Sequence, residues 1–369
     1  YRIDLMPAPA LYAQGVLDPF AGAGPEDPAY DLLYVTDRRP ATEEDKEPYY
    51  TSDRGHALRV GAARVELVAD PPLDWEEAKR QSLASERKAR FPLQVEGREE
   101  YGVVAPGLAS YAGVEAEDAA VRRFAREIDA HLERAQIKDV FVYVPGFKVV
   151  FEDPVLVAAE LWHFLGYEGV FLAYSWPATP SVWAYTGDVE TAAYSARNLR
   201  VLVEFLSRHT SARRIHVLGY SAGTRVVFGA VSQIALLDPG RKRFRLGHVM
   251  LTAGDVDGDL VASFLEDGLL EVCDSLTLYQ SESDSALGFS RWLFSRKRVG
   301  QAGDEQNLEE RARAYLRSRD DLVVINATEA IGAKSGNGHG YFRKSPWVSS
   351  DILLTLRYGL GPAERGLER

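Results

Sequence analysis

The sequence has a single cysteine, Cys273, among its 369 residues. It can therefore form neither an intramolecular disulfide nor a cysteine-rich zinc site. A small buried apolar residue is the simpler interpretation of Cys273, and a reactive thiol is the alternative. Basic residues are also in deficit, because 43 Lys and Arg against 54 Asp and Glu give a formal charge of −11. A phosphate backbone needs a basic surface, so the composition argues against nucleic acid as a partner.

Long apolar runs are missing as well. No stretch of about 18 uninterrupted apolar residues occurs, so we expect no transmembrane segment. The chain starts at Tyr1 and shows no basic segment followed by an apolar one. We therefore interpret the start as processed or trimmed, which is compatible with a removed export signal and leaves the location open.

What the chain does contain is an ordinary globular composition, with 46% hydrophobic and 26% charged residues. Two parts differ in their patterns. Residues 1–115 begin with a Pro- and Gly-rich segment and continue with short apolar or alternating runs, which are typical of β-strands. Strands are predicted at 31–36, 57–61 and 63–69. We expect this part to be a β-rich extension that packs on residues 116–369.

From residue 116 onward, helical patterns alternate with apolar runs. Residues 119–135 carry apolar side chains at helical spacing, and residues 140–144 form a continuous apolar run typical of a fully buried strand. Further strands are predicted at 169–174, 215–218, 249–252, 276–279 and 322–326, with helices near 154–162, 199–206 and 226–234. This alternation predicts a mostly parallel sheet with helices on both faces. The chemistry of such sheets lies in loops at the carboxyl ends of the strands.

The loop after the predicted strand 215–218 reads Gly219-Tyr220-Ser221-Ala222-Gly223, a G-x-S-x-G sequence. In a sharp strand-to-helix turn this pattern presents the serine hydroxyl above the sheet, and the glycines let neighbouring backbone approach closely. The pattern alone is a weak indication, but an apolar strand precedes it and a helical pattern follows it. We therefore predict Ser221 as a nucleophile, with a structural glycine-rich turn as the alternative.

A serine nucleophile needs a base, which follows it in the chain order Ser, acid, His of this class of fold. Only two histidines follow Ser221. His248 lies just before a predicted strand and is interpreted as an edge or core residue. His339 lies among glycines in the loop 336–340, where it is well suited to reach over a site. We predict His339 as the general base, with a solvent-exposed loop histidine as the alternative.

The orienting carboxylate is expected just after the strand 276–279. Asp284 is the preferred residue there, and Glu282 is its close competitor. Asp255 and Asp257 follow the preceding strand and are more distant alternatives.

The segment from Asp255 to Glu266 also matches some carboxylate positions of a calcium-binding loop. Leu260 stands where the sharp turn of that loop needs glycine, and a strand precedes the segment where a helix is required. A solvated acidic loop is therefore the preferred interpretation, and no metal site is predicted.

An oxyanion hole needs two backbone N–H groups that point at the developing charge. One is expected from Ala222, next to the nucleophile. The other is expected from Phe147, because Gly146 lets the chain bend after the strand 140–144. An ordinary strand-end turn is the alternative for this second loop.

Residues 176–194 are unusually aromatic and follow a predicted strand. We expect them to form a cap or pocket wall over the nucleophile, since apolar aromatic walls suit acyl or aryl ester groups. The expected pocket residues are Trp176, Trp183, Tyr185 and Tyr220. Packing of these aromatic residues within their own loop is the alternative.

Several of these segments together resemble the bacterial α/β-hydrolases of the DUF900 group. They are Tyr34-Val-Thr-Asp-Arg38, Pro145-Gly146-Phe147, Tyr174-Ser-Trp-Pro177, Gly219–Gly223, Asp255-Val-Asp257 and Tyr279–Leu287. The resemblance covers nearly the whole chain and implies an α/β-hydrolase fold with a triad at Ser221, Asp284 and His339. It contributes little on substrate, because the family is named for its unknown function. Its members often look exported or lipid-anchored, which is compatible with a trimmed start.

The chain departs from the family pattern in two places. Pro145 stands where a histidine usually precedes the glycine of the oxyanion loop, which leaves the backbone donor intact but removes any role of that side chain. Tyr220 and Ala222 stand where histidine and methionine are commoner, which changes the shape of the pocket more than the mechanism.

The sequence as a whole predicts a serine hydrolase that cleaves carboxylic esters through an acyl-enzyme, without a metal or organic cofactor. The expected partner is a small-molecule or polymeric ester substrate. Amide or peptide hydrolysis by the same triad is one alternative, and a binding protein that keeps an inert serine turn is another.

Overall fold

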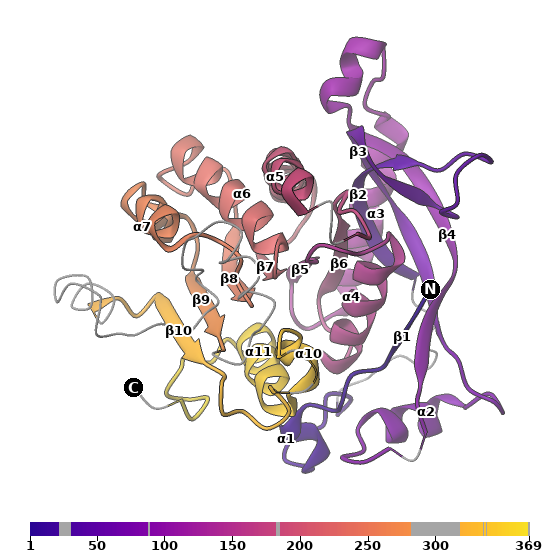
Figure 1. Ribbon diagram of the computed structural model, residues 1–369, viewed down its shortest axis with the longest axis vertical. Helices are drawn as coiled ribbons and strands as arrows, with labels where there is room; N and C mark the ends of the chain where they lie inside the picture. Colours follow the sequence, from indigo (N-terminus) through magenta and orange to yellow (C-terminus); the bar gives the residue numbers. More distant parts are fainter. Residues whose placement is uncertain are drawn as a thin grey trace.

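The strands form one sheet that runs through the whole molecule (Figure 1). The computed structural model describes residues 1–21, 31–87, 89–181, 185–281, 318–334, 336 and 338–367, with only the backbone of residues 185 and 186. Within these ranges the sheet has ten strands in the order β1-β4-β3-β2-β6-β5-β7-β8-β9-β10. This arrangement confirms the predicted mostly parallel α/β architecture with additional N-terminal strands.

The N-terminal part contributes four antiparallel strands to one side of the sheet. They are β1 (Arg2–Asp4), β2 (Asp31–Pro40), β3 (Tyr50–Leu67) and β4 (Pro92–Ala105). Strand β2 also pairs in parallel with β6 (Val170–Ser175), with Leu33 opposite Leu172. Residues 1–115 therefore supply strands to the same sheet as the rest of the chain, and do not pack on it as a separate layer.

Two details of this part differ from the sequence prediction. The strands expected at 57–61 and 63–69 are one continuous strand, β3, because Gly61 pairs within the ladder and does not break it. Strand β4 was not predicted. Four of the six residues from Glu96 to Tyr101, in the middle of the strand, are charged, so they interrupt the apolar alternation that would reveal it.

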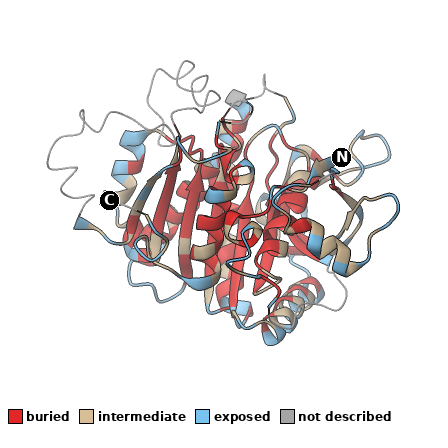
Figure 2. Ribbon diagram, turned by 90° about the horizontal axis from the view of Figure 1, so that it is seen from below, coloured by how far each residue is buried: buried red, intermediate tan, exposed pale blue. Residues whose placement is uncertain are grey.

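The remaining strands are parallel to one another and lie where the apolar runs predicted them. They are β5 (Asp139–Val144), β6, β7 (Arg214–Tyr220), β8 (Leu246–Thr252), β9 (Ser275–Gln280) and β10 (Leu322–Asn326). Every residue of β5 is buried, as expected for a strand that is covered on both faces. Figure 2 shows this buried band along the centre of the molecule.

Helices cover both faces of the sheet and create two apolar cores. One face carries α3 (Asp118–Arg134), α5 (Tyr185–His209), α6 (Gly223–Leu237) and α7 (Gly258–Glu266); the other carries α1 (Ala10–Ala13), α4 (Glu152–Phe164), α10 (Tyr341–Lys344) and α11 (Pro346–Tyr358). Figure 1 shows α5, α6 and α7 grouped apart from α4, α10 and α11. Val142 and Phe141, adjacent on β5, point into different cores. Among the helices of the described residues, none combines the length and apolar content needed to cross a bilayer.

Shorter helices lie outside these two layers. Helix α2 (Trp75–Ser82) follows β3, and two 3₁₀ helices, η1 (Gly107–Ala112) and η3 (Leu269–Val272), precede α3 and β9. Asp74 caps α2 by accepting a hydrogen bond from the Glu77 N–H, which satisfies one of the free donors at the start of the helix.

The described part of the aromatic segment 176–194 ends in a helix, and its role as a cap stays a prediction. Helix α5 begins at residue 185, and its side chains Ala192, Leu199 and Val203 are buried in the same core as α6. The spacing of these apolar residues is helical, so packing on the sheet determines the conformation from residue 185 onward. The aromatic composition does not reveal this helix, whereas the spacing of its apolar residues does.

Cys273 is a buried residue between η3 and β9. Its side chain is 3% exposed, and burial raises the pKa of its thiol to about 12. A thiol with so high a pKa has almost no thiolate at neutral pH. The structure thus agrees with the interpretation of Cys273 as a small core residue.

A buried carboxylate on α4 links three distant segments. Glu160 has no exposed side-chain surface, and it accepts hydrogen bonds from the Arg343 guanidinium and from the Met6 N–H at 3.0 Å. Arg343 belongs to α10, and Met6 precedes α1. The contact therefore ties the N-terminal segment and the C-terminal helices to the same point of α4.

The substitution Glu160→Ala should lower the free energy of unfolding by about 2–4 kcal/mol, because it leaves the Met6 N–H without its acceptor and the partly buried Arg343 guanidinium without its carboxylate. Urea denaturation provides the measurement. Glu133→Ala, at an exposed position of α3, is the matched control and should change stability by less than about 0.5 kcal/mol. Equal stability of the two variants would contradict the structural role of Glu160.

Candidate active site

Ser221 lies in the turn between β7 and α6, at the carboxyl end of a central strand. Strand β7 ends at Tyr220 and α6 begins at Gly223, so two residues reverse the chain direction. Ser221 has a φ of 52°, in the left-handed region that non-glycine residues rarely adopt. A strained residue at this point of an α/β sheet is the geometry by which a G-x-S-x-G turn exposes its serine.

The glycines of the turn are needed because other parts of the chain approach them closely. A Cβ atom on Gly223 would lie 2.2 Å from the Pro145 carbonyl oxygen. A Cβ atom on Gly219 would lie 2.9 Å from Leu251 Cδ2. The structure confirms the expected close approach of backbone at Gly223, whereas at Gly219 a side chain would displace the ends of neighbouring apolar side chains.

Hydrogen bonds hold the strained turn in place. The Ser221 N–H donates to the Thr252 carbonyl at 3.0 Å, which connects the turn to the end of β8. The Ser221 carbonyl accepts from the Thr224 N–H at 3.0 Å and from Thr224 Oγ1 at 2.5 Å. Thr224 Oγ1 in turn accepts from the Asp255 N–H at 3.0 Å. An unfavourable backbone angle persists only when its surroundings determine it in this way.

His339 reaches the serine from the loop before α10. Its Nε2 atom lies 2.7 Å from Ser221 Oγ, although 118 residues separate the two. The imidazole is 8% exposed, so it is not a solvent-exposed loop histidine. The structure brings together two side chains that the sequence analysis selected separately, and their catalytic roles stay predictions.

The ring of Tyr220 lies beside this histidine and contacts Phe342 in turn. The rings of Tyr220 and His339 have centroids 5.1 Å apart, and those of Tyr220 and Phe342 lie 4.8 Å apart. Tyr220 is half-buried, whereas Phe342 is buried in the core below. Tyr220 is therefore next to the candidate base, where it was expected to shape a pocket, and its substrate contact stays a prediction.

The other histidine that follows Ser221 has a structural environment. His248 stacks on His216 with ring centroids 5.0 Å apart, and its Nδ1 lies 2.8 Å from Ser275 Oγ. Burial, followed by the neighbouring His216, lowers the pKa of His248 to about 4. His248 lies near the start of β8, at the opposite end of that strand from Thr252 and the serine turn. This agrees with its interpretation as an edge or core residue.

The preferred acid, Asp284, and its competitor Glu282 lie outside the described residues, so their role stays a prediction. The more distant alternatives are described. Asp255 is 2% exposed and accepts a hydrogen bond from Arg225 Nε at 3.2 Å. Asp257 caps α7 by accepting from the Asp259 and Leu260 N–H groups. Asp255 thus contacts a residue of α6, and Asp257 caps α7.

The role of Asp257 as a helix cap also explains the acidic sequence that resembles part of a calcium loop. Within the described ranges, no group of three or more His, Cys, Asp or Glu side chains converges as a metal site would require.

The loop after β5 lies directly against Ser221. A Cβ atom on Gly146 would be 2.9 Å from Ser221 Cβ, so only glycine fits here. Phe147 follows, half-buried against the apolar core. Ala222 is the N-cap of α6, and its N–H therefore has no acceptor within that helix. The two expected oxyanion donors, Phe147 and Ala222, thus belong to segments that adjoin the serine, and their donor role stays a prediction.

Trp176 has a different position from the one expected. It is completely buried, and its indole N–H donates to the Pro145 carbonyl oxygen at 2.8 Å. Trp176 follows β6 directly and belongs to the apolar core, so it packs against the loop after β5 and does not present a pocket wall. Trp183 and the side chain of Tyr185 lie outside the described residues; the backbone of Tyr185 begins α5.

Arg38 also contacts the loop beside the serine, although the sequence analysis gave it no role. Arg38, at the end of β2, is completely buried and donates a hydrogen bond to the Val149 carbonyl at 3.0 Å, in the same loop as Gly146. Its only signal in the sequence was its place in the segment Tyr34–Arg38, one of those that resemble the DUF900 group.

Comparison with known protein families matches residues 121–357 to the α/β-hydrolases of unknown function called DUF900. A search of curated proteins found no match to the chain. The matched region is more than half of the sequence and includes β7, the serine turn and His339. With a mostly parallel sheet, helices on both faces and this family match, the protein belongs to the DUF900 family of α/β-hydrolases.

Proposed function

We propose that the protein is a serine hydrolase that cleaves carboxylic esters through an acyl-enzyme. The observation that supports this most directly is the 2.7 Å contact between Ser221 Oγ and His339 Nε2 at a serine held at a φ of 52°. Membership of the α/β-hydrolase family gives a hydrolase as the general class. The serine mechanism and the ester substrate are the finer steps of the proposal.

His339 acts as the general base. A base must lie within about 2.6–3.2 Å of the group whose proton it takes, and the contact with Ser221 Oγ is within that range. In the tautomer with the proton on Nδ1, Nε2 accepts the serine proton as Oγ attacks the substrate carbonyl. The Asp284 carboxylate accepts a hydrogen bond from the Nδ1–H group of His339, and it stabilises the imidazolium that forms.

The tetrahedral oxyanion is stabilised by the N–H groups of Phe147 and Ala222. The start of α6 adds to this, because the free N–H groups of a helix N-terminus favour negative charge. The closeness of Gly146 to Ser221 supports the assignment, since it brings the loop of Phe147 beside the attacking atom. Neither donor depends on a side chain, so the replacement of the usual histidine by Pro145 leaves this function intact.

Collapse of the intermediate expels the alcohol, which takes its proton from His339, and leaves an acyl group on Ser221 Oγ. Water, activated by His339, then releases the acid. An ester is the favoured substrate because an alkoxide leaves more readily than an amide nitrogen. Tyr220, with Trp183 and Tyr185, forms the wall against which the acyl or alcohol group of a small or polymeric ester packs.

The substitution Ser221→Ala should abolish labelling by a fluorophosphonate probe and lower kcat by at least about 10³-fold. Thermal unfolding should change little, because alanine keeps the Cβ atom and meets the same backbone constraint. Ser232→Ala, at a buried serine further along α6, is the matched control and should label normally. Ordinary activity in Ser221→Ala would remove the basis of the proposal.

Asp284→Asn should reduce kcat by up to about 10⁴-fold, because an asparagine favours the wrong tautomer of His339. Asp255→Asn keeps the size of a side chain that accepts a hydrogen bond from Arg225, and because Asp284 is the proposed acid, its effect on kcat should be much smaller. Steady-state kinetics of both variants make the comparison. A larger loss in Asp255→Asn would show that the acid is Asp255.

Substrate class can be tested with p-nitrophenyl esters of increasing acyl length beside the matching p-nitroanilides. We expect ester hydrolysis that disappears in Ser221→Ala and no comparable hydrolysis of the anilides. Anilide hydrolysis of equal or greater rate would identify an amidase. Folded protein that neither hydrolyses these compounds nor reacts with the probe would identify a binding protein with an inert serine.

A further inference from the structure

Arg38 is a charged side chain without any exposed surface, at the end of β2. Burial lowers the pKa of its guanidinium to about 10, against the opposing effect of the Asp37 carboxylate, so the group keeps its charge at neutral pH. A buried charge is strongly unfavourable unless hydrogen bonds replace the lost water. The positions of the hydrogen-bond acceptors of Arg38 therefore indicate which parts of the chain the buried guanidinium stabilises.

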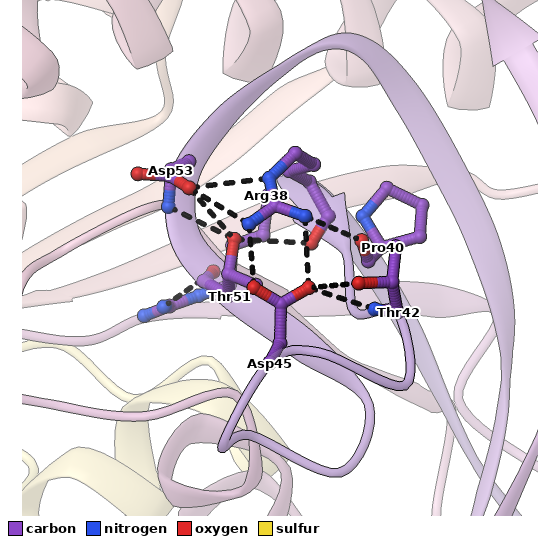
Figure 3. Close-up of polar contacts among 7 residues, drawn as sticks. Arg38, Pro40, Thr42, Asp45, Thr51 and Asp53 are labelled. Atoms are coloured by element: carbon purple, nitrogen blue, oxygen red, sulfur yellow. Dashed lines mark hydrogen bonds and ion pairs between the residues drawn. The ribbon is translucent and has the colours of Figure 1, made fainter.

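Those acceptors belong to three segments that are distant in sequence. Four hydrogen bonds use its donors: Nε to Ser175 Oγ (3.0 Å), Nη1 to the Thr51 carbonyl (3.2 Å), and Nη2 to the carbonyls of Val149 (3.0 Å) and Ala178 (3.3 Å). Thr51 belongs to β3, Val149 to the loop after β5, and Ser175 and Ala178 to the end of β6 and the chain beyond it. Figure 3 shows Arg38 beside Thr51. The guanidinium thus connects both strand-end loops to the N-terminal strands.

The hydrogen bonds of the neighbouring Asp37 carboxylate are made with α5, and those of the Arg38 guanidinium are made with other groups. The Asp37 Oδ2 atom accepts from Ser195 Oγ at 2.8 Å and from Asn198 Nδ2 at 2.9 Å, both on α5. The Arg38 donors are therefore directed at backbone carbonyls and at one hydroxyl. Lysine could not replace this arrangement, because the planar guanidinium directs its donors along several fixed directions and an ammonium is a compact point charge.

The loop between β5 and α4, residues 145–151, is held near both ends. At its start, the Trp176 indole N–H donates to the Pro145 carbonyl at 2.8 Å. Near its end, Arg38 binds the Val149 carbonyl and Ser175 Oγ donates to the Phe151 carbonyl at 3.4 Å. Within this loop Lys148 has a φ of 63°, a strained value for a non-glycine residue.

We propose that Arg38 is a positioning residue that, together with Trp176, holds the 145–151 loop so that the Phe147 N–H points at the oxyanion. The inference rests on the proposed serine-hydrolase function. An oxyanion donor is effective only within about 2.7–3.1 Å of the charge, and a displacement of about 1 Å can lower the rate about 10²-fold. Arg38 belongs to residues 1–115, so the N-terminal strands help to build the catalytic geometry.

The adjacent arginine provides a matched control. Arg39 is partly exposed and forms ion pairs with Asp45 at 2.8 Å and Asp53 at 3.0 Å. Figure 3 shows these two carboxylates around the same part of β2. Arg39→Met removes a charged side chain one position away without touching the 145–151 loop. Its kcat should remain within about twofold of the natural protein.

The test compares Arg38→Met, Arg38→Lys, Trp176→Phe and Arg39→Met with the natural protein on p-nitrophenyl butyrate. Fluorophosphonate labelling taken to completion counts the intact Ser221 sites, so that kcat is expressed per labelled site. We expect kcat per site to fall about 10²-fold in Arg38→Met, with smaller losses in Arg38→Lys and Trp176→Phe. KM should stay within about twofold, because the oxyanion contact forms in the transition state.

If Arg38 only stabilises the fold, its substitution gives a different combination of measurements. It lowers the number of labelled sites and the unfolding temperature, and it leaves kcat per labelled site unchanged. Natural kcat per site in folded Arg38→Lys and Trp176→Phe would overturn the inference. This comparison remains decisive if Arg38→Met fails to fold.

Hydrogen exchange of a peptide that covers residues 145–151 tests the loop without activity. Exchange should be faster in Arg38→Met or Arg38→Lys and in Trp176→Phe, and unchanged in Arg39→Met. Unchanged exchange in all variants would show that Arg38 and Trp176 do not hold the 145–151 loop, and it would overturn the inference. If the natural protein is not labelled at Ser221, the proposed function fails and the catalytic role of Arg38 fails with it. If labelling and esterase activity are normal but kcat per site is insensitive to these substitutions, only this inference fails.

Discussion

The close contact between the serine turn and the loop after β5 is the constraint on which the candidate site depends. Gly223 and Gly146 allow this contact, because a Cβ atom on either would overlap the opposite segment at 2.2 and 2.9 Å. The same contact brings the loop that contains Phe147 against Ser221. Both segments include a non-glycine residue with positive φ, Ser221 and Lys148. Such backbone strain is maintained only by surrounding hydrogen bonds and packing, so the site requires a rigid support.

That support comes from parts of the chain that are distant in sequence. The turn is tied to β8 through Thr252, whereas the loop is tied to the end of β6 through Trp176 and to β2 through Arg38. Because β2 pairs in parallel with β6, the N-terminal strands are part of the scaffold around the loop. The buried contact of Glu160 with Arg343 connects the helices of the opposite face in a similar way.

The sequence predicted those features that depend on local patterns. Strand β5 and helix α3 were found because buried strands and amphipathic helices have characteristic spacings of apolar residues. Strand β4 escaped prediction because its partners, and not its own alternation, determine its conformation. Trp176 was expected in a pocket wall because aromatic composition does not indicate the direction of a side chain. Its indole N–H instead binds Pro145 inside the core.

By itself, the sequence determined the α/β class, the serine turn and the selection of Ser221 and His339, since strand-end motifs and chain order are local and linear properties. Only the tertiary structure decided that these two side chains approach to 2.7 Å, because they lie 118 positions apart in the sequence. It alone also revealed the position of Arg38, whose four hydrogen bonds join segments up to 140 residues apart. A buried charge gives no periodic signal in a sequence, and its function appears only when its acceptors are brought together by folding.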